Sequence, residues 1–246
     1  MPDNNSKKQH IESFYDDFHT QKARGPARIM LWSRFHILKK IIKKTSGNIL
    51  VVGCGSQKEM SILPSSAEGY GIDISKRAVE YARKEFPRYD IRVADASHLP
   101  FGDSFFTTIV CSEVIEHVEN ADEAMSEFAR ALEPKGTLVL TTPNWWSWYG
   151  IFRLFGELIM RKPLTSDNQP IDHWSTPHAM RKKIQQHFTV EKFRGFWYYL
   201  PFGKGHIQIP SVCTIPIVVI LWPIELLLRI LLPWFGHSMI FVCKKK

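Results

Sequence analysis

The feature that most constrains this chain is a glycine-rich turn directly after a strand-like apolar run. Residues 48–57 read NILVVGCGSQ, so apolar residues lead straight into Gly53, Cys54 and Gly55. An apolar run of this length predicts a buried strand, and glycine allows another group to approach the backbone closely. The pattern therefore predicts a strand–turn–helix unit whose turn contacts a ligand.

Strand-like and helix-like segments alternate after this turn. Strands are expected at 68–74, 89–95, 105–114 and 136–144, and helices after Ser56, at 76–86 and at 120–132. This succession is typical of parallel βαβ units with helices on both faces of one sheet. Further along, we expect helices at 145–160 and 175–188 and strands at 188–199 and 238–245.

The chain divides into four regions by composition. We expect an N-terminal helical cap at 1–46, a core at 47–200, an apolar insertion at 201–237 and the last core strand at 238–246. The cap includes a basic amphipathic helix at 28–44, preceded by a shorter helix at about 9–21. The net charge of +8 is concentrated at the two ends, which favours contact with an anionic surface, either a membrane or a nucleic acid.

The cysteines do not have the spacing of a metal site or a disulfide framework. Cys54, Cys111, Cys213 and Cys243 form no CxxC pair, so we expect buried thiols in a reducing cytoplasm and no metal. The polar N-terminus has no apolar stretch typical of a signal peptide.

Asp73 has the position of a ribose-binding carboxylate. It follows Gly53 by twenty positions, at the end of the second expected strand, where an acid can accept both hydroxyls of a ribose held over the turn. A dinucleotide site normally has a third glycine at the start of the helix, where this chain has Lys58. That position disfavours a nicotinamide cofactor.

Several stretches together resemble the seven-strand S-adenosylmethionine-dependent methyltransferases, especially the branch that includes the quinone-biosynthesis enzymes. The matching stretches, in order, are ILVVGCG, GIDIS, VADASHLPF, EVIEHV and LEPKGTLVLTTPN. The resemblance covers 48–144 well and 172–199 loosely. It implies an α/β three-layer Rossmann-like sandwich with a mostly parallel seven-stranded sheet and an antiparallel last strand.

The resemblance also implies which residues hold S-adenosylmethionine. The turn would lie under the methionine part, the acid after the second strand would hold the ribose, the acid after the third strand the adenine amino group, and the residues after the fourth strand the methionine end. The residues at these positions are Gly53, Cys54, Gly55, Asp73, Ile74, Asp95, Ala96, Ser112 and Glu113. Asp95 also suits a second role, as the cap of the turn that follows it.

Two positions depart from the family pattern. The family often carries an acid two positions before the first glycine, where this chain has Val51. It often has a third glycine two positions after Gly55, where this chain has Gln57. The first change removes a polar anchor near the ammonium of the cofactor, and the second makes the turn less bare.

Methyl transfer to a hydroxyl or an acidic carbon also requires a general base. His173 leads the candidates, with Asp172 as its orienting partner or as an alternative base. His117, in EVIEHV, is a further candidate, although in the family this Glu-His pair is more a packing and hydrogen-bonding feature. A structural role for each histidine remains open.

The acceptor is expected to be a small apolar or lipid-linked molecule, methylated at oxygen or carbon. After the fourth strand the chain reads SEVIEH, not the Asn/Asp-Pro-Pro-aromatic motif of enzymes that methylate amino groups, and no RNA-binding module is visible. RNA methylation through the basic termini and a non-catalytic cofactor-binding scaffold remain the alternatives.

The apolar insertion leaves two interpretations open. Between Ile207 and Gly236 the only charged residues are Glu225 and Arg229, and four prolines divide the run into pieces too short to span a bilayer. The insertion is either a lid over an apolar pocket or dimer interface, or a segment that dips into the membrane boundary with Trp222, Trp234 and Phe235. The second interpretation places a cytoplasmic protein peripherally on the inner face of an anionic membrane.

Overall fold

The computed structural model describes residues 11, 13–16, 26–55, 59–161, 170–198, 223, 224 and 226–246. Its centre is one seven-stranded sheet with the strand order β3-β2-β1-β4-β5-β7-β6. The strands are β1 Gly47–Val52, β2 Ala67–Asp73, β3 Asp90–Val93, β4 Phe106–Ser112, β5 Leu132–Pro143, β6 Phe188–Phe196 and β7 Ser238–Lys245. Strands β1 to β5 are parallel, and β7 runs antiparallel to both β5 and β6. The expected fold class is therefore confirmed.

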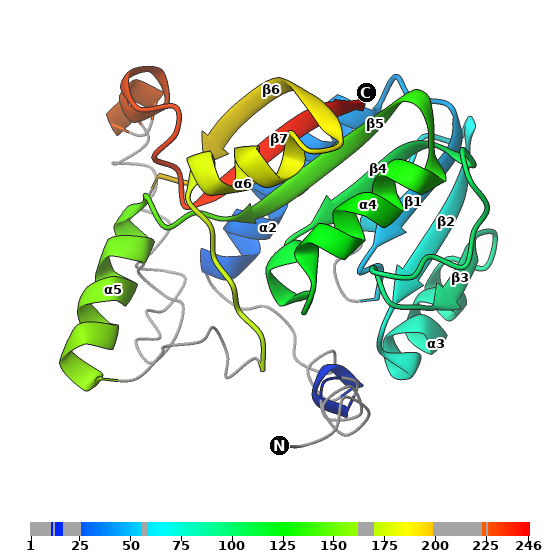
Figure 1. Ribbon diagram of the computed structural model, residues 1–246, viewed down its shortest axis with the longest axis horizontal. Helices are drawn as coiled ribbons and strands as arrows, with labels where there is room; N and C mark the ends of the chain where they lie inside the picture. The colour runs from blue at the N-terminus through cyan, green and yellow to red at the C-terminus, as the bar shows by residue number, and fades with distance from the viewer. Residues whose placement is uncertain are drawn as a thin grey trace.

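Helices cover both faces of the sheet and make three layers (Figure 1). One face packs against α4 (Ala121–Ala131) and α6 (Pro177–Ile184), which bury Phe128 and Met180 in the core. The other face packs against α2 (Pro26–Ile42) and α3 (Lys76–Glu85), which bury Leu38 and Val79. The remaining helices are α5 (Trp148–Met160) and the short 3-10 helices η1 (Glu59–Ile62) and η2 (Ile115–His117).

The expected boundaries hold best where a local signal marks them. The side chain of Ser75 caps α3 by accepting a hydrogen bond from the N–H of Ala78, as Ser and Asn do at helix starts. Asn120 caps α4 in the same way through Glu123. Strand β5 begins at Leu132, four residues before the expected start, because Leu132 pairs with Phe106 ahead of a register shift in the ladder.

Most of the expected apolar insertion lies outside the described residues, including Trp222, Glu225 and Cys213. Its described part is helical at 223, 224 and 226–231. In the described part of the chain, no helix combines the length and apolarity that crossing a membrane requires. The described cysteines, Cys54, Cys111 and Cys243, are buried and unbridged.

Candidate functional site

The glycine turn after β1 lies at the carboxyl edge of the parallel strands, where the order reverses between β1 and β4. Gly53 has a φ of +73°, and a Cβ there would lie 2.4 Å from Cγ2 of Val114. A Cβ on Gly55 would lie 2.2 Å from Cβ of Ala78. Both glycines are therefore required by packing within the protein. Ligands of open α/β sheets bind at this kind of crevice.

The N–H groups of the turn all have protein partners, so the turn is less bare than the sequence suggests. Gly53 and Cys54 both donate to the carbonyl of Ile72, over 2.8 and 3.0 Å. Gly55 donates to Oδ2 of Asp73 over 3.0 Å. The turn is thus fastened to the end of β2, and it holds the Asp73 carboxylate in place.

Asp73 and Asp95 follow neighbouring strands. Asp73 is 7% exposed, and its Oδ1 accepts a hydrogen bond from the N–H of Ser75 over 3.0 Å. Its carbonyl accepts from the N–H of Ala94, which brings the end of β3 beside it. Asp95 is half-buried, and its Oδ1 accepts from the N–H of Ser97 over 2.9 Å, in a turn cap. Asp95 thus caps the turn that follows β3.

The two other residues predicted beside the adenine flank these acids. Ile74 is half-buried directly after Asp73, and Ala96 is buried directly after Asp95.

An N-terminal segment, 13–16, crosses the same edge, and no sequence motif predicts its contacts there. Oδ1 of Asp16 accepts hydrogen bonds from Oγ of Ser75 over 2.5 Å and from the N–H of Arg77 over 3.2 Å. The ring centroid of Tyr15 lies 6.3 Å from that of His117. Burial raises the pKa of Tyr15, and so do the nearby carboxylates of Glu116, Asp172 and Asp73. The segment therefore spans from α3 to η2.

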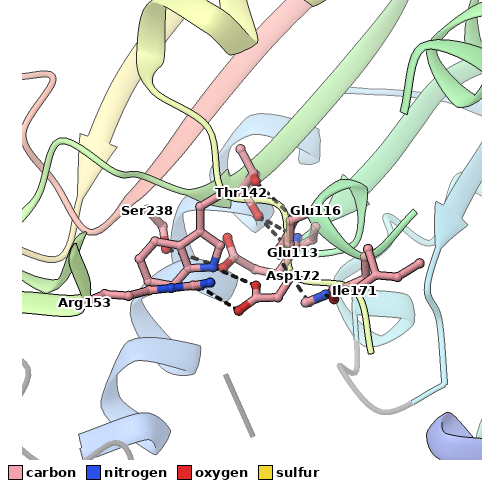
Figure 2. A network of polar contacts seen from close by, with 11 residues as sticks. Glu113, Glu116, Thr142, Arg153, Ile171, Asp172 and Ser238 are labelled. Atoms are coloured by element: carbon pink, nitrogen blue, oxygen red, sulfur yellow. Dashed lines mark hydrogen bonds and ion pairs between the residues drawn. The ribbon is translucent and has the colours of Figure 1, made fainter. Parts of the chain in front are cut away.

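Ser112 and Glu113 form the floor on the β4 side. Oγ of Ser112 lies 3.1 Å from Oγ1 of Thr141 on β5. Glu113 has a φ of +53°, and its N–H donates to the carbonyl of Thr141 over 3.0 Å. Oγ of Ser238 on β7 donates to Oε2 of Glu113 over 3.5 Å (Figure 2). Three strands thus converge on these two residues.

Glu116 lies fully buried beside Glu113. Oγ1 of Thr142 donates to its Oε2 over 3.1 Å, and Nε2 of His117 lies 3.7 Å from its Oε1. Burial raises the pKa of Glu116 well above its usual value, and the charge of Glu113 raises it further. Burial therefore disfavours the charged form of Glu116.

The two candidate histidines flank one contact between η2 and the segment 171–173. Nδ1 of His117 lies 2.8 Å from the carbonyl of Ile171, and the N–H of His173 donates to the carbonyl of Glu116 over 2.8 Å. The side chain of His117 is mostly buried, whereas His173 is exposed. The structure therefore places both histidines near the same edge of the site.

Asp172 is engaged by two side chains other than His173. Nη1 of Arg153 on α5 donates to its Oδ2 over 2.7 Å, and Nε1 of Trp174 donates to its Oδ1 over 2.7 Å (Figure 2). The Arg153 guanidinium stacks 4.6 Å from the ring centroid of Trp174 and 5.1 Å from that of Trp145. Arg153 was not predicted from the sequence, because it lies inside an aromatic run that shows only helical periodicity.

The charge of this edge is predominantly acidic. Of the described carboxyl groups around it, Asp172 pairs with Arg153 and Glu59 with Arg34. The others that line it are Asp73, Asp95 and Glu113, beside the Glu116 carboxyl, whose charged form burial disfavours. Such a site suits a ligand with positive charge and sugar hydroxyls. Among the described residues, no three His, Cys, Asp or Glu side chains are grouped so that they could hold a metal ion.

Comparison with known proteins agrees with this geometry. A family model described as a methyltransferase domain matches residues 50–140, which run from β1 into β5 and include every predicted cofactor-binding residue. The matched part of the chain, residues 50–140, is a class I S-adenosylmethionine-dependent methyltransferase domain. S-adenosylmethionine is the methyl donor of this family.

The curated relatives of this chain match over part of their length. The chain is 30% identical over 124 residues to a probable S-adenosylmethionine-dependent methyltransferase of Mycolicibacterium smegmatis, covering 49% of this chain and 48% of that protein. It is 30% identical over 119 residues to the ubiquinone/menaquinone biosynthesis C-methyltransferase of Desulfotalea psychrophila, covering 46% and 48%. It is 36% identical over 101 residues to the O-methyltransferase cnsE of Penicillium expansum, covering 38% and 37%. The chain thus spans at most about half the length of these relatives.

Solved structures share the fold of this chain at low sequence identity. A possible histamine N-methyltransferase of Thermotoga maritima superposes with a TM-score of 0.63 at 16% identity, covering 97% of this chain and 100% of that one. A SAM-dependent methyltransferase of Archaeoglobus fulgidus gives 0.57 at 19% identity, covering 86% and 94%. These likenesses extend the shared fold beyond the matched domain, to β6 and β7.

Proposed function

We propose that this protein transfers a methyl group from S-adenosylmethionine to a small apolar or lipid-linked acceptor, at oxygen or carbon. The observation that carries the proposal is the Asp73 carboxylate, held by the N–H groups of Gly55 and Ser75 at the edge where β1 and β4 diverge. Relatives named as C- and O-methyltransferases support the choice of atom.

Each residue of the cradle has a role in this proposal. Asp73 binds the ribose hydroxyls, with Ile74 beside the adenine, and Asp95 binds the adenine amino group, with Ala96 behind it. The turn Gly53–Gly55 lies under the methionine part, and Ser112 and Glu113 close that end. The acidic edge favours the donor, because its sulfonium and ammonium charges exceed its single carboxylate.

The donor supplies an electrophilic methyl group on a sulfonium sulfur. The acceptor atom forms the new bond to the methyl carbon, the carbon–sulfur bond breaks, and its electron pair stays on sulfur as S-adenosylhomocysteine. The protein aligns the two reactants and excludes water. If the acceptor carries a proton, we propose that His173 or His117 removes it, while Arg153 and Asp172 fix the segment that carries His173.

The surface beside the site supports an apolar acceptor. Helix α5 exposes large apolar side chains, with Ile159 80% and Leu158 73% exposed. Trp146 and Trp148 at its base contact Trp234 and Phe235 at ring-centroid distances of 5.7 and 5.3 Å. We propose that this surface contacts an anionic membrane peripherally, at the inner face, and that the acceptor enters from there.

One incubation tests the function. The protein is mixed with methyl-labelled S-adenosylmethionine and a host lipid extract, and the labelled product is identified by mass analysis. We expect label in a lipid-soluble product, and none with the Asp73→Ala variant. Label that enters RNA instead, or no transfer to any extract, would contradict the proposed acceptor. Flotation with anionic vesicles tests the membrane contact, which the double variant Leu158→Ser/Ile159→Ser should abolish.

A further inference from the structure

The lysines of the two chain ends meet at one edge of the sheet. Lys43 and Lys44 lie between the end of α2 and the start of β1, at the amino edge of the parallel strands. Strand β7 runs antiparallel to β5 and brings Lys244 opposite Thr137, near the amino end of β5. The described chain therefore ends at the edge where β1 begins, and α5 lies at the opposite edge (Figure 1).

The pairing of the strands shows how close these segments lie. Lys244 pairs with Thr137 on β5, and Thr137 pairs with Thr108 on β4. Thr108 pairs in turn with Ile49, five residues after Lys44. Lys244 is thus on the same row as Ile49, three strands away, which is a backbone separation of about 14 Å. Charges this close to one another can act together on one extended ligand.

Eight lysines form this surface, which we call the lysine edge. They are Lys39, Lys40, Lys43, Lys44, Lys135, Lys244, Lys245 and Lys246. Among the described residues, none of the eight forms an ion pair with a carboxylate. Nζ of Lys244 donates instead to Oγ1 of Thr137 over 2.8 Å, and Nζ of Lys245 donates to the carbonyl of Leu132 over 2.6 Å. These uncharged partners hold the ammonium groups in place without neutralising them.

The lysine edge lies opposite the candidate site. The six residues of β1 separate it from the turn at Gly53 by about 20 Å, and the twelve residues of β5 separate it from the base of α5 by about 40 Å. Among the described residues at the same ends of the strands, the acids Glu68 and Glu133 are outnumbered by the lysines, whereas the edge around Asp73 is acidic. The molecule is thus electrically polarised along its strands, and the group that the lysines bind is not the group that is methylated.

The composition of the lysine edge favours a nucleic acid as its ligand. Protein interfaces are depleted in lysine and enriched in aromatic residues, whereas nucleic-acid interfaces are strongly positive. A stable peripheral membrane contact combines basic residues with an apolar anchor, and the most exposed apolar side chains among the described residues, Leu158 and Ile159, are on α5 at the opposite edge. Ammonium groups contact phosphates as point charges, and phosphate contacts carry no sequence information.

We propose that the lysine edge binds the phosphate backbone of a nucleic acid, independently of its base sequence. This inference goes beyond the methyl transfer proposed above and does not depend on it. The nucleic acid is a docking partner that holds the protein by the edge opposite the crevice, so the crevice and α5 stay accessible. Because the lysines come from both ends of the described chain, each end should contribute to binding.

The test measures how tightly the protein binds a fluorescently labelled oligouridylate of about 20 nucleotides, by anisotropy, between about 50 and 200 mM salt. Each phosphate neutralised on a single strand contributes about −0.7 to the slope of log K against log salt, so the wild type should give a slope of about −3 to −5. Lys43→Gln/Lys44→Gln and Lys244→Gln/Lys245→Gln should each make the slope shallower by about 1.4 and weaken binding at the lowest salt by about tenfold or more. The two pairs combined should make it shallower by about 2.8.

The control is Lys76→Gln/Arg194→Gln, which removes the same charge from exposed positions outside the lysine edge. It should change the slope by less than about 0.5. Affinity for S-adenosylhomocysteine, measured by calorimetry, should stay within about twofold of the wild type in every variant, because the substituted side chains lie on the surface and away from the turn.

Three results would overturn the proposal: a wild-type slope shallower than about −1, a control pair that acts as strongly as the lysine pairs, or an effect of only one lysine pair. Binding to anionic vesicles without binding to the oligonucleotide would assign the lysine edge to a membrane and would overturn it too. Failure of the methyl-transfer function, tested with Asp73→Ala, would leave this proposal standing, because the donor and the nucleic acid bind at opposite ends of the strands.

Discussion

The carboxylate of Asp73 accepts a hydrogen bond from the N–H of Gly55, over 3.0 Å and across eighteen residues of sequence. This bond ties the end of β2 to the turn after β1, so the group that would bind a ribose also fixes the backbone beneath it. Recognition of the donor and stability of the turn are therefore coupled at this residue.

Asp73→Ala should weaken both the binding of the donor and the stability of the turn. The variant leaves the N–H groups of Gly55 and Ser75 without their acceptor, which should lower the free energy of unfolding by about 2–3 kcal/mol. Affinity for S-adenosylhomocysteine should fall at least about tenfold, as measured by calorimetry beside urea unfolding. Asp90→Ala, which breaks an exposed pair with Arg92, should change stability by less than about 1 kcal/mol. Unchanged ligand affinity in Asp73→Ala would remove Asp73 from the ribose site.

Two glycines give a matched pair of substitutions. A methyl group at Gly55 would overlap Ala78 and lie 3.0 Å from Oδ2 of Asp73, whereas nothing lies within 4 Å of a Cβ at Gly102. Gly55→Ala should therefore cost about 1–3 kcal/mol of stability and weaken donor binding, and Gly102→Ala should leave donor affinity unchanged. Thermal unfolding and calorimetry of both variants would check this, and equal behaviour would show that the turn tolerates a side chain.

The buried pair of Arg153 and Asp172 should be costly to break from one side. Arg153→Met leaves the Asp172 carboxylate buried with one fewer partner, at an expected cost of about 3–5 kcal/mol. Adding Asp172→Asn removes the lone charge, so the double variant should recover part of that loss in urea unfolding. Additive effects of the two substitutions would mean that the pair is not coupled.

The buried carboxyl of Glu59 should make stability depend on pH. Its pKa rises from 4.5 to about 7 on folding, chiefly through burial, so the folded protein holds the proton more tightly than the unfolded chain. The stability contribution is fully present below pH 4.5 and is lost as the pH rises through about 7, by up to about 3 kcal/mol. Glu59→Gln cannot titrate, so the difference in stability between variant and wild type should change between pH 5 and pH 8. Parallel curves would contradict the raised pKa.

The two histidines should differ in what their removal affects. If His173 is the base, His173→Ala should slow single-turnover methylation by about 10²- to 10⁴-fold, without changing affinity for S-adenosylhomocysteine. His117→Ala removes a side chain that contacts the carbonyl of Ile171, so it should also lower stability, by about 1 kcal/mol. A His173→Ala variant of full activity would leave His117 as the candidate.

The parallel half of the sheet was predictable because its signals are local. Apolar runs of strand length, capping residues such as Ser75 and Asn120, and the turn at Gly53 each act within a few residues. The spacing of Asp73 and Asp95 then follows from strand order alone, because parallel strands end at one edge of the sheet.

The rest of the site depends on contacts between distant segments. Asp16 reaches Ser75 across fifty-nine residues, and Arg153 meets Asp172 from a helix that shows only aromatic periodicity. Such contacts are set by tertiary packing, which no local pattern encodes.

The last residue pair between β6 and β7 determines which changes in chain length this protein can tolerate. Phe196 pairs with Ser238, so β6 ends and β7 begins at facing positions, and the two ends of the segment that joins them adjoin. A connecting segment whose two ends adjoin can be shortened, lengthened or exchanged while the pairing of β6 with β7 is kept. New surfaces could be grafted there without disturbing the parallel strands on the other side of β5.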